Sequence, residues 1–474
     1  MIARVAIILA FAGAAGGIVF PKVCDYMHVA PLRFLHMSMA LPAVLLGTRS
    51  WLTQPSYART WPVLACVAVS WIGLLYASDT ESMRGLWIVA GLTMPLPVAA
   101  LLVEQRAWWL AARTFVFCSA AMLVAAIWFE FRIYGFALGS MSRFGYLMSE
   151  DRVTDFANPN RMGGQLTVAA VLGLILYLRG LRAAYRPSPT GFNPGISLLW
   201  SLFLVFGFLL TASRTAVVAW VLAGGLLLLM GTRGLPVSRL RNLAGTLAVL
   251  LAVAMVAVTA TGVVPWERLK DRIVGENSRG LSTLGARIPI WSNAFRAWTS
   301  SPSCILMGTG TGVAEYLLAE YDEHVELDDY GHTFRSTHSI FIEWMLSFGV
   351  LGAVPGLCLV AGMTLKARSL DLRDGVVDRQ AFLLTVIIYS ASAVLYRQTY
   401  WLAPASLVLA MLSEPISRAK PGTNASSPVQ AIPSLKHPSA RLKVVRRDTS
   451  GVVAKHPAPR SRDLEVASGP GIKP

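Results

Sequence analysis

Apolar runs of membrane-spanning length recur along this chain. Twelve such runs, each about 15 to 24 residues long and bounded by Arg, Lys, Gly or Pro, fill most of the first 416 of its 474 positions. The sequence is 54% hydrophobic and 14% charged, against roughly 25% charged in a soluble domain, which excludes a soluble fold. We predict spans at 2–20, 34–48, 60–77, 85–103, 107–129, 163–178, 196–212, 215–230, 243–264, 338–362, 381–396 and 399–413.

The predicted fold is therefore an all-α, polytopic membrane domain over residues 1–416, with about twelve transmembrane helices. A large, partly helical outer loop at 265–337 separates the ninth and tenth helices. Residues 417–474 are rich in Pro, Ser, Ala and basic residues without helical periodicity, which predicts a disordered basic tail. The first run could instead be a cleavable signal peptide, although Arg4 serves equally well as an inner-side anchor.

The net charge of +16 follows the predicted topology. If the N-terminus is cytoplasmic, the inner segments hold 25 Lys and Arg against 7 Asp and Glu, whereas the outer segments hold 16 and 17. This inward excess of basic residues is the positive-inside rule, and it places both termini in the cytoplasm. The basic composition therefore reports orientation, and we predict no nucleic-acid partner.

The first candidate site residue is Arg214, at the tip of a short helical hairpin. Residues 196–230 are too long for one crossing and are interrupted only at 211–215. Two helices of about 16 residues span roughly 24 Å, less than a hydrocarbon core of ~30 Å, so the tip should be recessed. An arginine at the N-terminus of the second helix suits a phosphate group. The alternative is an arginine that snorkels to the headgroups.

The outer loop supplies two further candidates. Residues 285–300 read as a helix with an aromatic stripe of Trp291, Phe295 and Trp298, and Arg287 lies one turn before Trp291. The stripe could lie in the membrane interface or pack against the rest of the loop. His338 begins the tenth span, where a histidine could accept a proton from a hydroxyl nucleophile. A structural role for His338, or the same chemistry at His332, are the alternatives.

Other features of the outer segments carry weaker signals. Three further arginines add positive charge near the outer ends of spans, and they are Arg143, Arg161 and Arg397. The acidic run at 322–329 matches no known metal-binding spacing and reads as a solvated surface. The glycines of 308–312 follow no predicted strand, so we interpret them as a turn. Cys24 and Cys304 both face outward, and whether they pair is left open.

Four segments in order resemble the O-antigen ligase and polymerase superfamily of bacterial envelope glycosyltransferases. They are residues 211–215 at the hairpin, 285–291 and 308–312 in the large loop, and 337–352 at the start of the tenth span. The resemblance is strongest from about 196 to 355. It implies a membrane glycosyltransferase that moves a glycan from undecaprenyl diphosphate to an acceptor sugar, such as lipid A core, on the periplasmic side of the inner membrane.

By the same resemblance, Arg214 and Arg287 hold the diphosphate, His338 is the general base, and neither a metal nor another cofactor is needed. The expected partners are the lipid-linked glycan donor, an acceptor glycolipid or glycan, and membrane lipid. Two alternatives stay open: a polymerase for O-antigen or exopolysaccharide within the same superfamily, and a transporter of lipid-linked glycans. A transporter should line a midplane cavity with charges, whereas Glu343 is the main ionisable residue within the predicted spans.

Overall fold

The computed structural model describes about three fifths of the chain. The described residues are 1–17, 35–53, 60–75, 79–134, 146–148, 153–155, 159–183, 194–211, 213–231, 283–322, 326–327, 333–368, 376–392 and 401–413. By its contacts the chain divides into Met1–Ile416 and Ser417–Pro474, and the second unit lies outside the described residues. The predicted disorder of the tail therefore stays a prediction.

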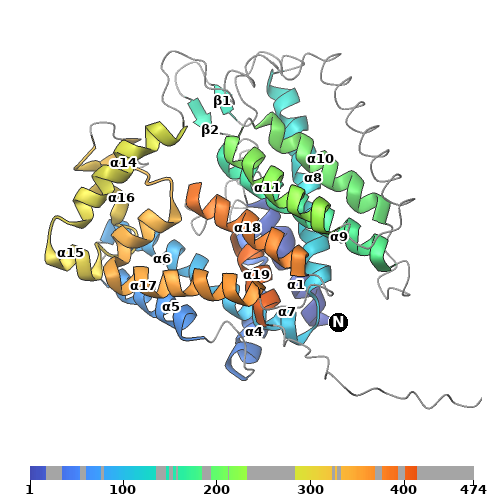
Figure 1. Ribbon diagram of the computed structural model, residues 1–474, viewed down its shortest axis with the longest axis horizontal. Coiled ribbons are helices and arrows are strands. Elements are labelled where there is room, and N and C mark those ends of the chain that lie inside the picture. The colour runs from blue at the N-terminus through green and yellow to red at the C-terminus, as the bar shows by residue number, and fades with distance from the viewer. Residues whose placement is uncertain are drawn as a thin grey trace, which may run out of the picture. The chain divides into compact units, whose positions relative to one another are not determined.

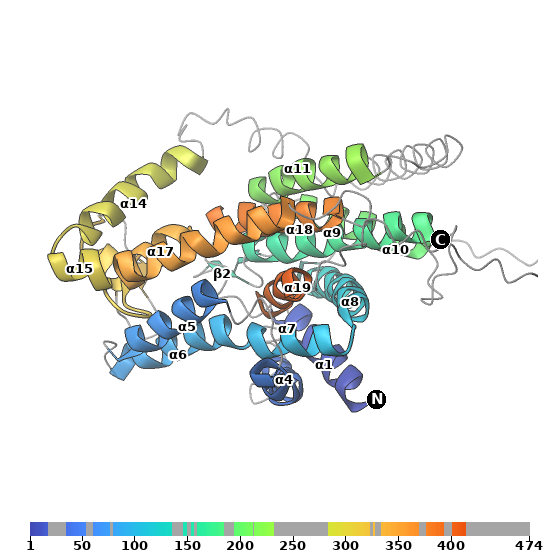
Figure 2. The ribbon, with the colours of Figure 1, turned by 60° about the horizontal axis from the view of Figure 1, so that its bottom comes forward.

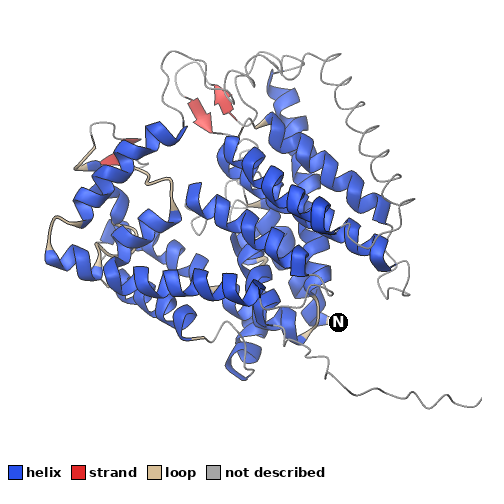
Figure 3. Cartoon of the chain, in the orientation of Figure 1, coloured by secondary structure: helices blue, strands red, loops and turns tan. Residues whose placement is uncertain are grey.

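Helices form nearly all of the described secondary structure (Figure 1 and Figure 3). A helix lies in every predicted span except 243–264, which falls outside the described residues. The helices are α1 (Ile2–Gly16), α3 (Leu35–Ser38), α4 (Leu41–Thr53), α5 (Trp61–Leu74), α6 (Asp79–Thr93), α7 (Pro95–Glu104), α8 (Trp108–Tyr134), α9 (Pro159–Ala183), α10 (Pro194–Leu210), α11 (Arg214–Gly231), α14 (Thr283–Trp298), α15 (Pro302–Met307), α16 (Ala314–Ala319), α17 (Ile340–Arg368), α18 (Val376–Ser392) and α19 (Leu402–Ser413).

The described residues confirm the all-α prediction, and two very short antiparallel hairpins are the additions to it. Strand β1 (Tyr146–Met148) pairs with β2 (Val153–Asp155), and β3 (Glu326–Leu327) pairs with β4 (Thr333–Phe334). Both hairpins lie in segments predicted as outer loops, where short stretches of two to three residues carry no alternating pattern long enough to detect.

Among the described residues, three helices are long and apolar enough to cross a membrane. They are Trp108–Trp128 in α8, Arg161–Leu181 in α9 and Ile340–Leu365 in α17, and six of the shorter helices are also apolar. Large apolar side chains on the outside, such as Phe117 and Leu357, would face water in a soluble protein but match a lipid-facing surface. The chain is a membrane protein, and the number of twelve crossings stays a prediction.

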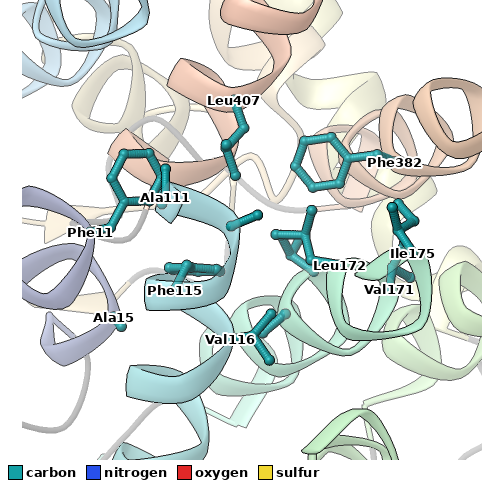
Figure 4. Packing of buried hydrophobic residues seen from close by; sticks show 14 of the residues in the cluster. Phe11, Ala15, Ala111, Phe115, Val116, Val171, Leu172, Ile175, Phe382 and Leu407 are labelled. Atoms are coloured by element: carbon teal, nitrogen blue, oxygen red, sulfur yellow. The ribbon is translucent and has the colours of Figure 1, made fainter. Parts of the chain in front are cut away.

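The main core is formed where α1, α8, α9, α18 and α19 meet. Phe11, Phe115, Leu172, Phe382 and Leu407 are all fully buried in it (Figure 4). Many of their neighbours are alanines, which let helix backbones approach closely, as is typical of helix packing in membranes. This core holds α9 in place. Helices α10 and α11, which form the hairpin, both pack against α9.

A separate packed cluster joins the large loop to α17. α14 and α15 lie against one end of α17 in both ribbon views (Figure 1 and Figure 2). The buried face of α14 consists of Ile290, Ala294 and Ala297, with Trp291 and Trp298 partly buried beside it. Phe295 is 54% exposed. Two of the three aromatic residues of the predicted stripe therefore pack within the loop. They lie beside the buried alanines Ala294 and Ala297, whose small side chains allow close packing.

The glycine run at 308–312 is a turn that docks on a kink of α17. Gly308, Gly310 and Gly312 all have positive φ angles, and Gly349 interrupts α17 with φ 57° and ψ −154°. The backbone N–H groups of Thr309 and Gly310 donate to the carbonyls of Leu346 and Ser347 at 2.9 Å. The turn thereby satisfies carbonyls that the kink releases from the helix, as buried backbone groups require. The prediction of a turn is confirmed.

Candidate functional site

Helix α14 brings Arg287 to the segment that carries His338. The indole Nε1 of Trp291 donates a hydrogen bond to the carbonyl oxygen of Thr337, the residue just before His338, at 3.0 Å. Arg287 precedes Trp291 by one helical turn, so the two side chains share a face of α14. The structure thus brings together two of the residues predicted for the site.

His338 adopts an unusual backbone conformation directly before α17. Its φ angle is +52°, in the left-handed region that costs an L-residue roughly 1–2 kcal/mol. Among the described residues other than glycine, Arg106 alone shares a positive φ. Residues held in such conformations cluster at functional sites, because the surrounding structure must stabilise them. The helix begins at Ile340, two residues later than the start of the predicted span.

A buried polar cluster fixes the residues on both sides of His338. Thr337 and Glu343 are fully buried, and Ser339 is 3% exposed. The hydroxyl of Thr337 lies 3.1 Å from Glu343 Oε2 and 3.1 Å from the carbonyl oxygen of Ser339, so both can accept its proton. The N–H of Glu343 donates to the carbonyl of Ser339 at 3.0 Å and begins the hydrogen bonding of α17. An acidic residue in the first turn, such as Glu343, also interacts favourably with the positive end of the helix dipole.

The surroundings of His338 keep its imidazole neutral. Burial lowers the pKa of His338 to about 4, and the positive charges of Arg287 and Arg335 act in the same direction. At neutral pH the ring therefore has a free lone pair that can accept a proton. Burial also lowers the pKa of Arg287, which reflects the partial loss of water around its guanidinium.

Arg335 is a site residue that the sequence reasoning missed. Its Nε lies 3.2 Å from Asp322 Oδ2, and its backbone N–H donates to the carbonyl of Glu315 at 2.9 Å. Asp322 and Glu315 are both largely buried. Asp322 belongs to the acidic run, so at this end the run balances a cation of the loop. The spacing of three residues between Arg335 and His338 was the available signal.

The hairpin tip lies against the start of α9. A Cβ atom at Gly163 would lie 2.8 Å from Ser213 Cβ and 2.9 Å from Thr211 Oγ1, so the contact requires a glycine. The N-termini of α9 and α11 therefore approach each other, and both present the positive ends of helix dipoles. The Oγ of Ser213 is buried there without a hydrogen-bond partner among the described residues.

For the remaining predicted site residues, the structure describes only some of the side chains. The backbone of Arg214 begins α11, but its side chain lies outside the described part of the chain. Arg161 lies in the first turn of α9 with an exposed side chain. Three predicted or alternative site residues, and one of the two outer cysteines, lie outside the described residues: Arg143, His332, Arg397 and Cys24. Within the described residues, Trp291 links α14 to the segment of His338, and the positive charge of Arg287 acts on His338.

This arrangement combines a neutral base with positive charge in a partly dehydrated site. A base with a cation near it can remove a proton from a nucleophile while the cation stabilises a negative leaving group. Glu343 and Asp322 are bound to neighbouring side chains, by the hydroxyl of Thr337 and the guanidinium of Arg335 respectively. The chemistry that these side chains favour is group transfer to a hydroxyl.

Comparison with known proteins agrees with this chemistry. Residues 199–355, about a third of the chain, match the family model described as O-antigen ligase. The matched segment runs from α10 to the middle of α17 and contains Arg214, Arg287 and His338. A search of curated proteins finds no match. The family points to a glycan ligase or polymerase class of membrane enzyme. The resemblance is thereby confirmed: residues 199–355 of this membrane protein carry a domain of the O-antigen ligase superfamily.

Proposed function

We propose that the chain transfers a glycan from undecaprenyl diphosphate to an acceptor sugar, such as lipid A core, on the periplasmic side of the bacterial inner membrane. The observation that carries this proposal is the neutral imidazole of His338 beside Arg287, within the matched ligase region. A polymerase that extends the glycan on the carrier lipid would use the same groups, and it is the second candidate.

In the proposed reaction, His338 accepts the proton of the acceptor hydroxyl. The hydroxyl oxygen forms a bond to the anomeric carbon of the donor sugar, and the bond between that carbon and the diphosphate oxygen breaks. The departing diphosphate keeps the electron pair, and Arg287 and Arg214 stabilise its charge. No nucleotide is consumed, because cleavage of the bond between the sugar and the diphosphate makes the transfer favourable. The proposal requires no metal or other cofactor.

The charge of the donor would tune the base. In the free protein Arg287 and Arg335 help to hold the pKa of His338 at about 4, which makes the ring a weak base. A bound diphosphate would offset these positive charges and raise the pKa of His338 toward neutrality, where a general base is most effective. His338 would then become an efficient base only when the donor is in place.

The surroundings of the hairpin tip support a phosphate-binding role for Arg214. Two helix N-termini approach each other there, and backbone N–H groups at such ends favour anions. Arg161 begins one of these helices and is the first further candidate for the diphosphate. Arg143 and Arg397 are weaker candidates on the same side of the predicted topology.

The proposed topology has twelve crossings, with residues 1–416 as the membrane domain, a disordered tail at 417–474 and both termini in the cytoplasm. The inward excess of Lys and Arg supports this orientation. The loop at 265–337 then lies in the periplasm, so Arg287 and His338 face the compartment in which nucleotide sugars are lacking. A donor carried by a lipid is the remaining source of activated sugar.

The test replaces Arg214, Arg287 and His338 singly in a strain that lacks the native protein. Each variant is first checked for membrane insertion, and envelope glycans are then separated on a gel. We expect all three variants to lose the transferred glycan, and normal glycan in all three would overturn the mechanism. Long chains left on the carrier lipid identify a ligase, whereas core with at most one repeat unit identifies a polymerase. Loss of activity in EDTA, restored by Mg²⁺, would contradict the metal-free mechanism.

A further inference from the structure

We propose that Trp291, Thr337 and Glu343, here called the clasp, position the imidazole of His338 beside Arg287. The inference rests on the proposed function, since it names the residues that hold its base in place. The three side chains are positioning residues, because they act through the backbone on either side of His338.

The first link of the clasp runs between two helices. The indole of Trp291 on α14 donates to the carbonyl of Thr337, and this carbonyl belongs to the peptide bond that leads into His338. Because Arg287 and Trp291 are one turn apart, fixing Trp291 also fixes the distance from Arg287 to the segment of His338. The hydrogen bond thus sets the relative position of cation and base.

The second link runs from Thr337 to the first turn of α17. The Thr337 hydroxyl donates to Glu343 Oε2 at 3.1 Å, and both residues are fully buried. Removing this hydroxyl would take one hydrogen-bond donor away from a fully buried carboxyl group, and this cost favours formation of the contact. Thr337 is therefore held at its carbonyl by α14 and at its side chain by α17.

Between these links, His338 has little freedom to turn. Its φ angle of +52° is a conformation that an isolated histidine rarely adopts, and the helix starts two residues later. The clasp supplies the constraint that keeps this conformation. Since a misplacement of about 1 Å in a catalytic group can lower a rate by about 100-fold, loss of the clasp should reduce transfer without removing any group that touches the donor.

The first experiment compares Thr337→Val with Thr337→Ser. Thr364→Val is the matched control, because the Thr364 hydroxyl bonds to Val360 within its own helix. We expect Thr337→Val to lower glycan transfer at least tenfold, while binding of undecaprenyl diphosphate to the purified protein changes less than threefold. Thr337→Ser keeps the hydroxyl and should restore most of the transfer. Equal transfer by Thr337→Val and Thr364→Val would overturn the proposal.

A second pair of variants decides the matter if Thr337→Val fails to fold. Trp291→Phe removes the indole donor, and Trp298→Phe is its control on the same helix, because the Trp298 Nε1 has no hydrogen-bond partner in the described part of the chain. The rate at which diethyl pyrocarbonate modifies His338, followed by mass spectrometry, should change in Trp291→Phe alone. Equal rates in both variants would count against the clasp.

The modification rate also separates this inference from the proposed function. If the wild-type protein neither binds undecaprenyl diphosphate nor transfers glycan, the proposed function is wrong, yet the rates still show whether Trp291 positions His338. Suppose instead that the wild-type protein transfers glycan, and that Trp291→Phe and Trp298→Phe have the same rate of His338 modification and the same turnover. The proposed function is then correct, and the proposal of the clasp is wrong.

Discussion

Helices α9 and α17 are both long and apolar, yet they occupy opposite environments. Within the segments long enough to cross a membrane, 83% of the α9 residues are buried, whereas the value for α17 is 22%. Both helices are apolar enough to cross a membrane, so hydropathy alone does not explain why one is covered by other helices and the other is not.

Small residues explain why α9 can be central. A Cβ atom at Gly173 would lie only 3.0 Å from Ser201 Cβ on α10, and the Ser201 hydroxyl donates to the Ala170 carbonyl at 2.8 Å. The buried amide of Gln165 on α9 is paired as well, since it donates to the Ala15 carbonyl and to Ser119. α9 is therefore a scaffold whose polar groups serve packing.

The sparse cover of α17 fits the chemistry proposed at its outer end. Leu351, Val354, Leu357 and Leu365 are between 49% and 64% exposed, which marks a face open to lipid. The same helix begins two residues after His338. A donor with a polyprenyl tail needs its diphosphate at the site and its tail in the bilayer, and a helix with one exposed apolar face permits both.

The largest effect is expected from His338→Gln. The amide keeps the volume and polarity of the side chain but cannot accept the proton, so transfer should fall by about 10² to 10⁴-fold. Glycan transfer in membranes at saturating donor measures this loss. Unchanged transfer would mean that His338 has no catalytic role and that the start of α17, like α9, serves packing only.

The next effect is expected from Arg287→Gln, with Arg296→Gln as its control on α14. Removing one charge-stabilising group costs about 10² to 10³-fold in rate. Arg296 lies on the same helix with an exposed side chain, so its loss should change the rate less than threefold. If both variants lose the same activity, general positive charge on the loop matters rather than a defined site.

A stability test compares the two helices directly. Leu172 in α9 is fully buried, whereas Leu357 in α17 is 64% exposed. Leu172→Ala should leave a cavity and lower the free energy of unfolding by about 2–5 kcal/mol, while Leu357→Ala should change it by less than about 0.5 kcal/mol. Thermal unfolding in detergent measures both values. Similar losses would show that protein covers α17 in the membrane.

Hydropathy was sufficient to predict where most helices lie. The runs at 107–129 and 163–178 correspond to α8 and α9, and the pattern at 285–300 corresponds to α14. The turn at 308–312 was also predictable, because glycines without a preceding strand favour a turn. Hydropathy depends on local composition, and the start of a helix and the presence of a turn are local properties.

The contacts around the base were beyond sequence reasoning. The sequence shows Glu343 as an ionisable residue within a predicted span, but its hydrogen bond to Thr337 depends on the backbone turn at His338. Trp291 was interpreted as part of an aromatic stripe, although its indole N–H bonds a carbonyl 46 residues away. Such pairings are decided by tertiary packing, and periodicity within one helix does not contain that information.

The smallest effect concerns Arg335 and the pH dependence of transfer. His338 must be neutral to accept a proton, so kcat/KM, which reports the free enzyme, should fall as the pH drops through about 4. Arg335→Gln removes one of the two positive charges that lower the pKa of His338, so that pKa should rise. The acid limb of the profile then moves to higher pH, whereas Arg296→Gln leaves it in place. An unchanged limb in Arg335→Gln, with the protein still folded at pH 4, would show that the charge of Arg335 does not help to keep His338 neutral.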